Sequence, residues 1–135
     1  MYLLDTNVCV YFMKNTYPAL TRQFMSYDPS ELLISSITVF ELEYGAAKSR
    51  WGEKTHNNML LFLAPFTILP FTEDDAFAAG KVRGVLESKG QTIGSYDLLI
   101  ASQGLVRNLT VITHNTREFN RVSGLRVEDW VPADQ

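Results

Sequence analysis

The sequence contains only one cysteine, Cys9, so the chain cannot form an internal disulfide. A fold without disulfides fits a reducing compartment, and we interpret Cys9 as a core residue rather than a nucleophile. No apolar run approaches the roughly 20 residues that span a bilayer, and the first five residues lack the basic stretch and long apolar run of a signal peptide. These absences predict a cytoplasmic protein without a membrane-spanning segment.

An excess of basic residues is also absent, because the chain has 12 Lys and Arg against 15 Asp and Glu. Domains that bind nucleic acids usually carry more Lys and Arg than this, so the total charge argues against a strongly basic binding domain. The argument weakens if several acids gather in a site that binds cations, because the remaining surface is then less negative. The position of the acids therefore matters more than their number.

Short apolar runs alternate with helical patterns along the 135 residues, which we expect to form a single domain, 1–135. The expected strands are 2–4, 32–34, 67–69 and 109–113, and the expected helices are 6–13, 17–25, 38–47, 59–66, 73–89 and 95–106. This alternation predicts an α/β fold with a mainly parallel, short-stranded sheet between two layers of helices.

Two of these segments carry more specific expectations. The polar stretch 48–58 is expected to begin as a loop before the helix at 59–66. The clearest amphipathic helix is 73–89, in which four apolar side chains have spacings that allow a shared face: Phe77, Val82, Val85 and Leu86. Gly90 is the expected stop of that helix.

Acidic and amide side chains lie at or near the predicted strand ends. Asp5 follows the first strand and Asn115 follows the strand at 109–113, so both should emerge at the same edge of the sheet. Glu41 and Asp97 lie in or just before predicted helices. Oxygen ligands that converge at such an edge suit a hard divalent cation such as Mg²⁺.

Helix capping explains the same residues without any chemistry. The segments 38–41 and 115–118 both fit the capping box, in which the last residue simply bonds the helix start. Asp5 fits the cap of the first helix, and Asp97 fits the negative charge that favours a helix N-terminus. The spacing of these residues alone leaves both interpretations open.

Five segments resemble the PIN-domain family, and within it the VapC toxins of type II toxin–antitoxin systems. They are Leu3-Leu-Asp-Thr-Asn7, Ser35-Ser-Ile-Thr-Val-Phe-Glu-Leu-Glu-Tyr-Gly45, Ile93-Gly-Ser-Tyr-Asp97-Leu-Leu-Ile-Ala101, Val111-Ile-Thr-His-Asn-Thr-Arg-Glu-Phe119 and Val122-Ser-Gly-Leu-Arg-Val-Glu-Asp-Trp130. Each segment is weak alone, but their order matches that of the family across nearly the whole chain. The resemblance implies a PIN-like three-layer α/β/α domain.

The resemblance also implies an Mg²⁺-dependent endoribonuclease, with Mn²⁺ as an alternative cofactor. It places Asp5, Glu41 and Asp97 on the family's metal site, where the metal activates water for phosphodiester hydrolysis. The fourth catalytic position is Asn115, where many members have Asp, so a neutral amide replaces a charged ligand. Glu118, one helical turn onward, is a candidate for the missing charge.

Neighbouring side chains are candidates for supporting roles. Residues expected to orient ligands or water, as polar neighbours of metal ligands commonly do, are Thr6, Asn7, Ser36 and Thr113. Residues expected to contact RNA phosphates are Lys14, Lys48, Arg50, Lys54 and Arg117, and for each of them ordinary solvated charge is the alternative. His114 should point away from Asn115 if the strand alternation continues.

The resemblance to the enterobacterial VapC branch further implies initiator tRNA, cut in its anticodon loop, as the substrate. It also implies a VapB-like antitoxin and a homodimer. Candidates for the antitoxin groove are Tyr11, Phe12, Phe24 and Met25, although core packing also explains them.

Two other functions are open at this point. A phosphatase with Asp5 as nucleophile usually needs a second acid two residues on, where this chain has Asn7. A catalytically inactive PIN-like module that binds protein or RNA gains some support from Asn115.

Overall fold

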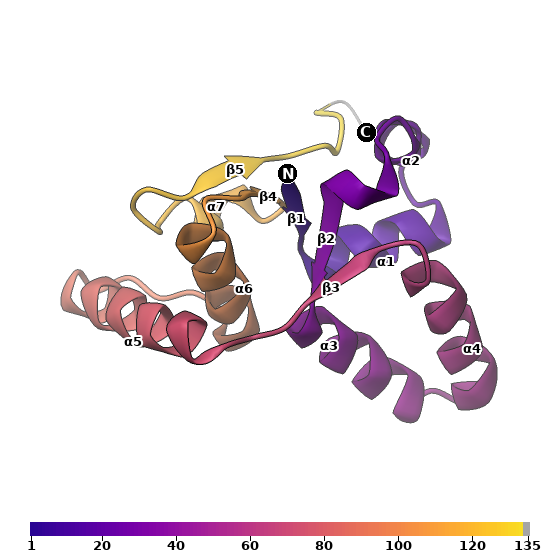
Figure 1. Cartoon of the computed structure of the whole chain (residues 1–135), viewed down its shortest axis with the longest axis horizontal. Coiled ribbons are helices and arrows are strands. Elements are labelled where there is room, and N and C mark those ends of the chain that lie inside the picture. Colours follow the sequence, from indigo (N-terminus) through magenta and orange to yellow (C-terminus); the bar gives the residue numbers. More distant parts are fainter. Residues whose placement is uncertain (134–135) are drawn as a thin grey trace.

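The centre of the molecule is a parallel sheet of five short strands. A computed structural model describes residues 1–133, with the strands in the order β3-β2-β1-β4-β5 (Figure 1). Their bounds are β1 (Tyr2–Leu4), β2 (Leu32–Ser35), β3 (Thr67–Leu69), β4 (Thr110–Ile112) and β5 (Arg126–Glu128). In register, Leu3 of β1 lies opposite Leu33 on one side and Val111 on the other. All four pairings are parallel, which confirms the predicted sheet.

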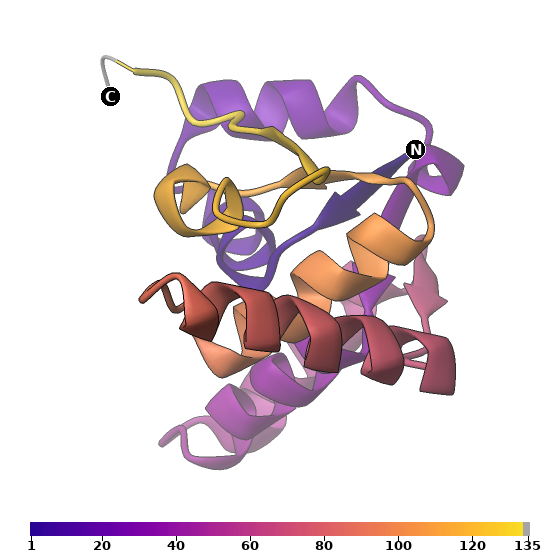
Figure 2. The ribbon, with the colours of Figure 1, turned by 90° about the vertical axis from the view of Figure 1, so that its left-hand side faces the viewer.

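Helices cover both faces of this sheet. One face packs against α1 (Thr6–Lys14), α2 (Pro18–Met25) and α4 (Gly52–Leu63), and the other against α5 (Glu73–Ser88), α6 (Ser95–Val106) and α7 (Thr116–Phe119). Helix α3 (Ser36–Ala47) runs away from the end of β2 beside α4, and a short 3-10 turn, η1 (Pro29–Glu31), precedes β2. Figure 2 views the molecule from the side of α5, which lies in front of α6.

The strands send alternate side chains into two separate cores. Leu4 and Ile34 belong to the core under α1 and α2, whereas Leu3 and Val111 belong to the core under α6. Because both faces are covered, neighbouring positions on one strand are all apolar, as is usual for buried parallel strands. The short apolar runs in the sequence therefore mark the strands of the central sheet.

Three expectations about the helices need correction. Helix α3 begins at Ser36 with Ser35 as its cap, two residues before the predicted start at Thr38, because the Ser35 side chain accepts a hydrogen bond from the Ile37 N–H. The polar stretch 48–58 begins as a loop, as expected, but helix α4 begins at Gly52 and not at Met59, so most of these polar residues lie on the exposed part of the helix. The third correction concerns α5, in which only part of the predicted apolar face packs inward.

Helix α5 faces the core with Ala79, Val82 and Leu86, while Phe77 and Val85 are exposed. Val82 and Leu86 of the predicted face are thus confirmed, but Phe77 and Val85 lie on a different side of the helix from the buried set. Gly90, with φ at 66°, lies directly after the cap of α5 and stops the helix, as expected. Within residues 1–133, no helix has both the length and the apolar character needed to cross a membrane.

Candidate active site

The sheet changes its winding direction beside β1. The chain passes from β1 to β2 and β3 on one side and then returns to β4 on the other side. The Asp5 N–H donates to the Ile112 carbonyl at 3.0 Å, which extends the β1–β4 pairing to the point where both strands end. In open parallel sheets this is the position where ligands bind.

Asp5 is almost completely buried at this edge, with 2% of its surface exposed. One carboxylate oxygen accepts the Val8 N–H at 2.8 Å, and the other accepts the Thr113 hydroxyl at 2.5 Å. Asp5 therefore caps α1, as the capping interpretation predicted, and is also tied to the end of β4.

Burial raises the pKa of Asp5 to about 6, above its usual value near 4. The hydrogen bonds from Thr113 and Val8 oppose this rise, and the negative charges of Asp97 and Glu41 add to it. These two carboxylates thus lie close enough to Asp5 to affect its ionisation.

Glu41 lies in the middle of α3 and is oriented by a pair of threonines. Its Oε1 accepts the Thr6 hydroxyl at 2.7 Å, and that hydroxyl lies 3.0 Å from the Thr38 hydroxyl. Thr38 is fully buried within the helix, so the capping-box interpretation of 38–41 is wrong. We did not predict the supporting position of Thr38, because the local Thr-x-x-Glu pattern already explained it as a cap.

Asp97, Asn115 and Glu118 form the other side of the site. Asp97 lies in the first turn of α6, and the Asn115 amide nitrogen donates to it at 3.4 Å and to Glu118 at 2.7 Å. Asn115 occupies the cap position of α7, but its side chain makes no capping hydrogen bond. The capping-box interpretation of 115–118 is therefore also wrong, and Asn115 bridges two carboxylates instead.

The acidic cluster consists of Asp5, Glu41, Asp97 and Glu118. Burial raises the pKa of Asp97, the hydrogen bond from Asn115 opposes this, and the charges of Glu41 and Glu118 raise it further. Like charges held this close favour either a bound cation or partial protonation. The oxygen donors match the ligands of Mg²⁺ by chemistry. As placed, no three acidic, His or Cys side chains within residues 1–133 lie at a spacing that would hold an ion.

The predicted supporting residues divide into two groups. Thr6 and Thr113 each donate a hydroxyl to a carboxylate of the cluster. Ser36 instead accepts the Phe71 N–H at 3.1 Å, and Asn7 is exposed. His114 points away from the cluster, as expected, with its Nδ1 atom 2.9 Å from Asp129.

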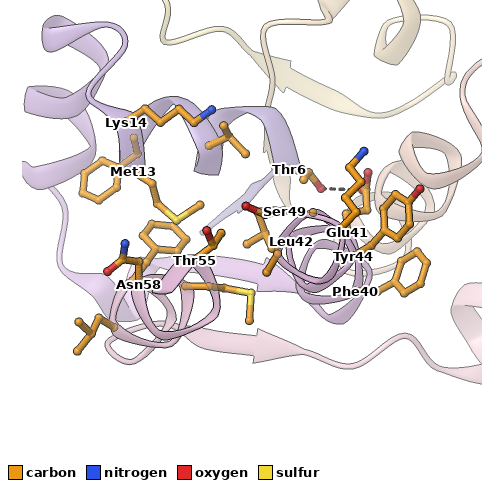
Figure 3. A pocket seen from close by; sticks show the side chains of 18 of the residues that line it. Thr6, Met13, Lys14, Phe40, Glu41, Leu42, Tyr44, Ser49, Thr55 and Asn58 are labelled. Atoms are coloured by element: carbon orange, nitrogen blue, oxygen red, sulfur yellow. Dashed lines mark hydrogen bonds between the residues drawn. The ribbon is translucent and has the colours of Figure 1, made fainter. Parts of the chain in front are cut away.

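A groove of about 1060 Å³ between α1, α3 and α4 opens beside Glu41. Figure 3 shows the Thr6–Glu41 hydrogen bond at one end, Met13 and Lys14 of α1 on one wall, and Thr55 and Asn58 of α4 on another. The residues predicted for an antitoxin groove mostly lie elsewhere, and only Phe12 lines this one.

The other three groove candidates have different surroundings. Phe24 is buried in the core against Phe12, with the two rings stacked at 4.0 Å. Tyr11 packs edge-on against Tyr17, and Met25 is exposed on α2 away from the groove lining. Core packing thus accounts for Phe24, whereas the exposed Met25 stays a candidate for a docking surface.

The five predicted phosphate-binding cations are all exposed. Lys14 and Lys48 line the groove, and Lys48 also lies over the Tyr44 ring, 4.8 Å from its centre. Arg50 and Lys54 border a shallow hollow at the start of α4, whereas Arg117 lies apart from them on α7, one residue before Glu118. Of the five cations, Lys14 and Lys48 thus share the groove with Glu41, and Arg117 precedes Glu118 on α7.

Comparisons with known proteins agree with this arrangement. The PIN domain family model matches residues 2–125. The tRNA(fMet)-specific endonuclease VapC of Shigella flexneri is 38% identical over 96% of this chain and 97% of its own length. Ribonuclease VapC2 of Rickettsia felis is 39% identical over 96% of this chain and 98% of its own length.

A solved structure has the same fold at similar identity. It is the crystal structure of DNA-bound VapBC from Salmonella typhimurium, which superposes with a TM-score of 0.89 at 38% identity and covers 96% of this chain and 97% of the matched chain. A likeness that spans almost the whole of both chains at this identity extends beyond a shared fold. This chain therefore belongs to the PIN-domain family and, within it, to the VapC ribonucleases.

Proposed function

We propose that this chain is the toxin of a type II toxin–antitoxin module and that it hydrolyses RNA phosphodiester bonds with Mg²⁺ or Mn²⁺. The observation that carries the proposal is that Asp5, Glu41 and Asp97, from three separate elements, act on one another's ionisation near the carboxyl edge of the sheet in a chain of the VapC family. Carboxylates that affect one another's ionisation without a basic partner among their contacts suit a divalent cation.

The residues of the chain would hold and orient the reacting groups. Asp5, Glu41 and Asp97 would hold the ion, with Glu118 nearby to add negative charge. A bound Mg²⁺ or Mn²⁺ would neutralise the phosphate and lower the pKa of the attacking water. Thr6 and Thr113 limit the rotation of their carboxylates, and Asn115 holds Asp97 beside Glu118.

The geometry disfavours a phosphatase that uses Asp5 as a covalent nucleophile. Asn7, at the position where such an enzyme needs a second acid, is exposed and cannot donate a proton as a carboxyl group does. Hydrolysis by water requires no side-chain nucleophile.

We propose initiator tRNA, cut in the anticodon loop, as the substrate, which would place the protein in the cytoplasm. The Shigella flexneri and Salmonella typhimurium relatives are both named tRNA(fMet)-specific endonuclease VapC, at 38% and 39% identity. The exposed cations Lys14 and Lys48 line the groove beside Glu41, and Arg117 is exposed next to Glu118 in the chain, so all three are suited to contact phosphates of a folded RNA.

We also propose a VapB-like antitoxin as the protein partner. The related structures from Rickettsia felis and Salmonella typhimurium are both of VapBC, each bound to DNA. The groove beside Glu41 would let such a partner lie across the entrance to the acidic cluster. The homodimer stays a prediction, which sedimentation of the purified chain would test.

One experiment tests the substrate most directly. The chain would be expressed without an antitoxin, and the new RNA ends would be sequenced, with Asp97→Asn as the inactive control. We expect new ends in the anticodon loop of initiator tRNA that are absent in the control. New ends only in other RNAs would contradict the tRNA proposal, and no new ends would favour the inactive binding module.

A further inference from the structure

The connection between β3 and α5 is attached to two helices that carry site residues. On one side, the hydroxyl of Ser36, the first residue of α3, accepts the Phe71 N–H at 3.1 Å. On the other side, the Gln103 amide nitrogen, from α6, donates to the Leu69 and Pro70 carbonyls, both at 3.2 Å. Residues 69–71 thus join the start of α3 to the middle of α6.

These two helices present opposite sides of the acidic cluster. Glu41 lies five residues after Ser36 on α3, and Asp97 lies six residues before Gln103 on α6. A helix is stiff over one or two turns, so a shift at either attachment moves the carboxylate on the same helix. The separation between the Glu41 and Asp97 backbones therefore depends on the length and strength of the two attachments.

The connection is also anchored where it enters α5. Thr72 caps α5 in a reciprocal capping box with Asp75, and the buried Asp75 carboxylate pairs with Arg107 at the end of α6. The link at Arg107 and the link at Gln103 lie one helical turn apart on the same side of α6. The connection is therefore fixed to α6 at two points, and its bond to Ser36 then holds α3 at a set distance from α6.

Gln103 is an unfavourable residue for packing alone. Its side chain is fully buried, and its amide oxygen has no hydrogen-bond partner within residues 1–133. A buried polar atom without a partner is costly, and an apolar side chain of similar volume would avoid that cost. What Gln103 supplies is the pair of hydrogen bonds to the connection.

We propose that Ser36 and Gln103 are positioning residues that set the separation of Glu41 and Asp97 by fixing α3 and α6 to residues 69–71. The proposal rests on the proposed metal site. It also gives Ser36 a different role from the one expected from the sequence, because Ser36 acts through the Phe71 backbone and not on a ligand directly.

Calorimetric titration with Mn²⁺ alone tests this role without RNA. The variants are Gln103→Met and Ser36→Ala, with Ser36→Thr as the conservative variant that keeps the hydroxyl. The control is Gln91→Met, which makes the same change at an exposed glutamine. Melting temperatures in chelator would be measured alongside, because a purely structural role would lower stability without changing the Mn²⁺ affinity of the folded protein.

We expect Gln103→Met and Ser36→Ala each to raise the Kd for Mn²⁺ roughly tenfold, while Ser36→Thr and Gln91→Met stay close to wild type. If Gln103→Met does not fold, the comparison of Ser36→Ala with Ser36→Thr still decides the result. If wild type and Ser36→Ala both bind Mn²⁺ with the same Kd, the positioning role is overturned but the metal site is not. A wild-type protein that does not bind Mn²⁺ would overturn the metal site and the proposed function with it.

Discussion

Asp5 caps a helix and, in the proposed function, also holds the metal ion with the same side chain. It caps α1 through the Val8 N–H and is fixed to β4 by the Thr113 hydroxyl, while the charges of Asp97 and Glu41 act on it from across the site. The capping and metal-site interpretations of Asp5 are therefore compatible. A sequence pattern cannot separate them, because both require a carboxylate directly after the strand.

The raised pKa of Asp5 predicts how the stability of the metal-free protein depends on pH. Its pKa rises from 3.8 to about 6 on folding, so the folded protein binds the proton more tightly than the unfolded chain. The free energy of unfolding should then fall as the pH rises from about 4 to about 6, by about 3 kcal/mol, and the loss persists above that range. Asp97, whose pKa is also raised, acts in the same direction.

Urea unfolding in chelator across this pH range would measure the effect in wild type and in Asp5→Asn. The variant cannot bind the proton, so it should lose the part of the pH slope that Asp5 contributes. If the two proteins show the same slope between pH 4 and pH 6, Asp5 is not the buried, charge-coupled group described above.

Asn115 departs from the fully acidic pattern and gives a second prediction at this scale. Its amide nitrogen faces both Asp97 and Glu118, so Asn115→Asp places another carboxylate between them. The added charge should lower the Mg²⁺ concentration needed for half-maximal RNA cleavage, and Asn115→Ala should raise it. Titration of cleavage rate against Mg²⁺ for the three proteins checks this, and equal half-maximal concentrations would remove Asn115 from the metal site.

At the scale of elements, the strands were easier to predict than the helix starts. Leu3-Leu4 and Leu33-Ile34 are apolar on both faces of the sheet, so their runs stand out from the surrounding polar sequence. The start of α3 was misplaced because a cap is one polar residue among several, and the start of α4 was misplaced because Trp51 at its cap position makes no side-chain capping hydrogen bond. Ser35, Ser36 and Thr38 all suit a helix start, and only the three-dimensional structure shows which one accepts the hydrogen bond.

Contacts between distant segments leave no recognisable pattern in the sequence. Gln103 lies 33 or 34 residues from its acceptors, and Arg107 lies 32 residues from Asp75. No local periodicity links such positions, so the spacer between α3 and α6 was not predicted. The acidic residues themselves were named from the sequence because each follows a strand or lies in a segment that resembles the family.

The packing of α6 on β4 gives a prediction about two helix glycines. A Cβ atom at Gly104 would lie 2.7 Å from a Val111 methyl carbon and 3.2 Å from Leu125, whereas one at Gly80 meets nothing within 4 Å. Gly104→Ala should therefore destabilise the protein by about 1–3 kcal/mol, because the buried Val111 must move. The matched control, Gly80→Ala, should stabilise the protein by roughly 0.5–1 kcal/mol. Chemical denaturation of both variants checks the pair, and a stable Gly104→Ala would contradict this packing of α6.

At the scale of the whole molecule, the distribution of charge resolves an apparent conflict. A net charge of -3 argues against nucleic-acid binding if the charge is spread evenly. Here four carboxylates lie near the edge of the sheet, while Lys14 and Lys48 in the groove beside Glu41 and Arg117 on α7 remain exposed. A bound divalent ion would offset much of the local negative charge, and the face that meets RNA would then be less negative than the total suggests.

The most direct test of the metal site is a cleavage assay on purified initiator tRNA. Wild type, Asp97→Asn and Asp74→Asn would be compared in Mg²⁺ and in chelator, where Asp74 is an exposed acid of α5 outside the cluster. We predict that wild type and Asp74→Asn cleave the tRNA in Mg²⁺. The cleavage rate should fall roughly 100-fold or more in Asp97→Asn, and in every protein when chelator replaces Mg²⁺, because the ion supplies several kcal/mol of transition-state stabilisation. Cleavage that persists in chelator, or that is equal in Asp97→Asn and wild type, would contradict the account.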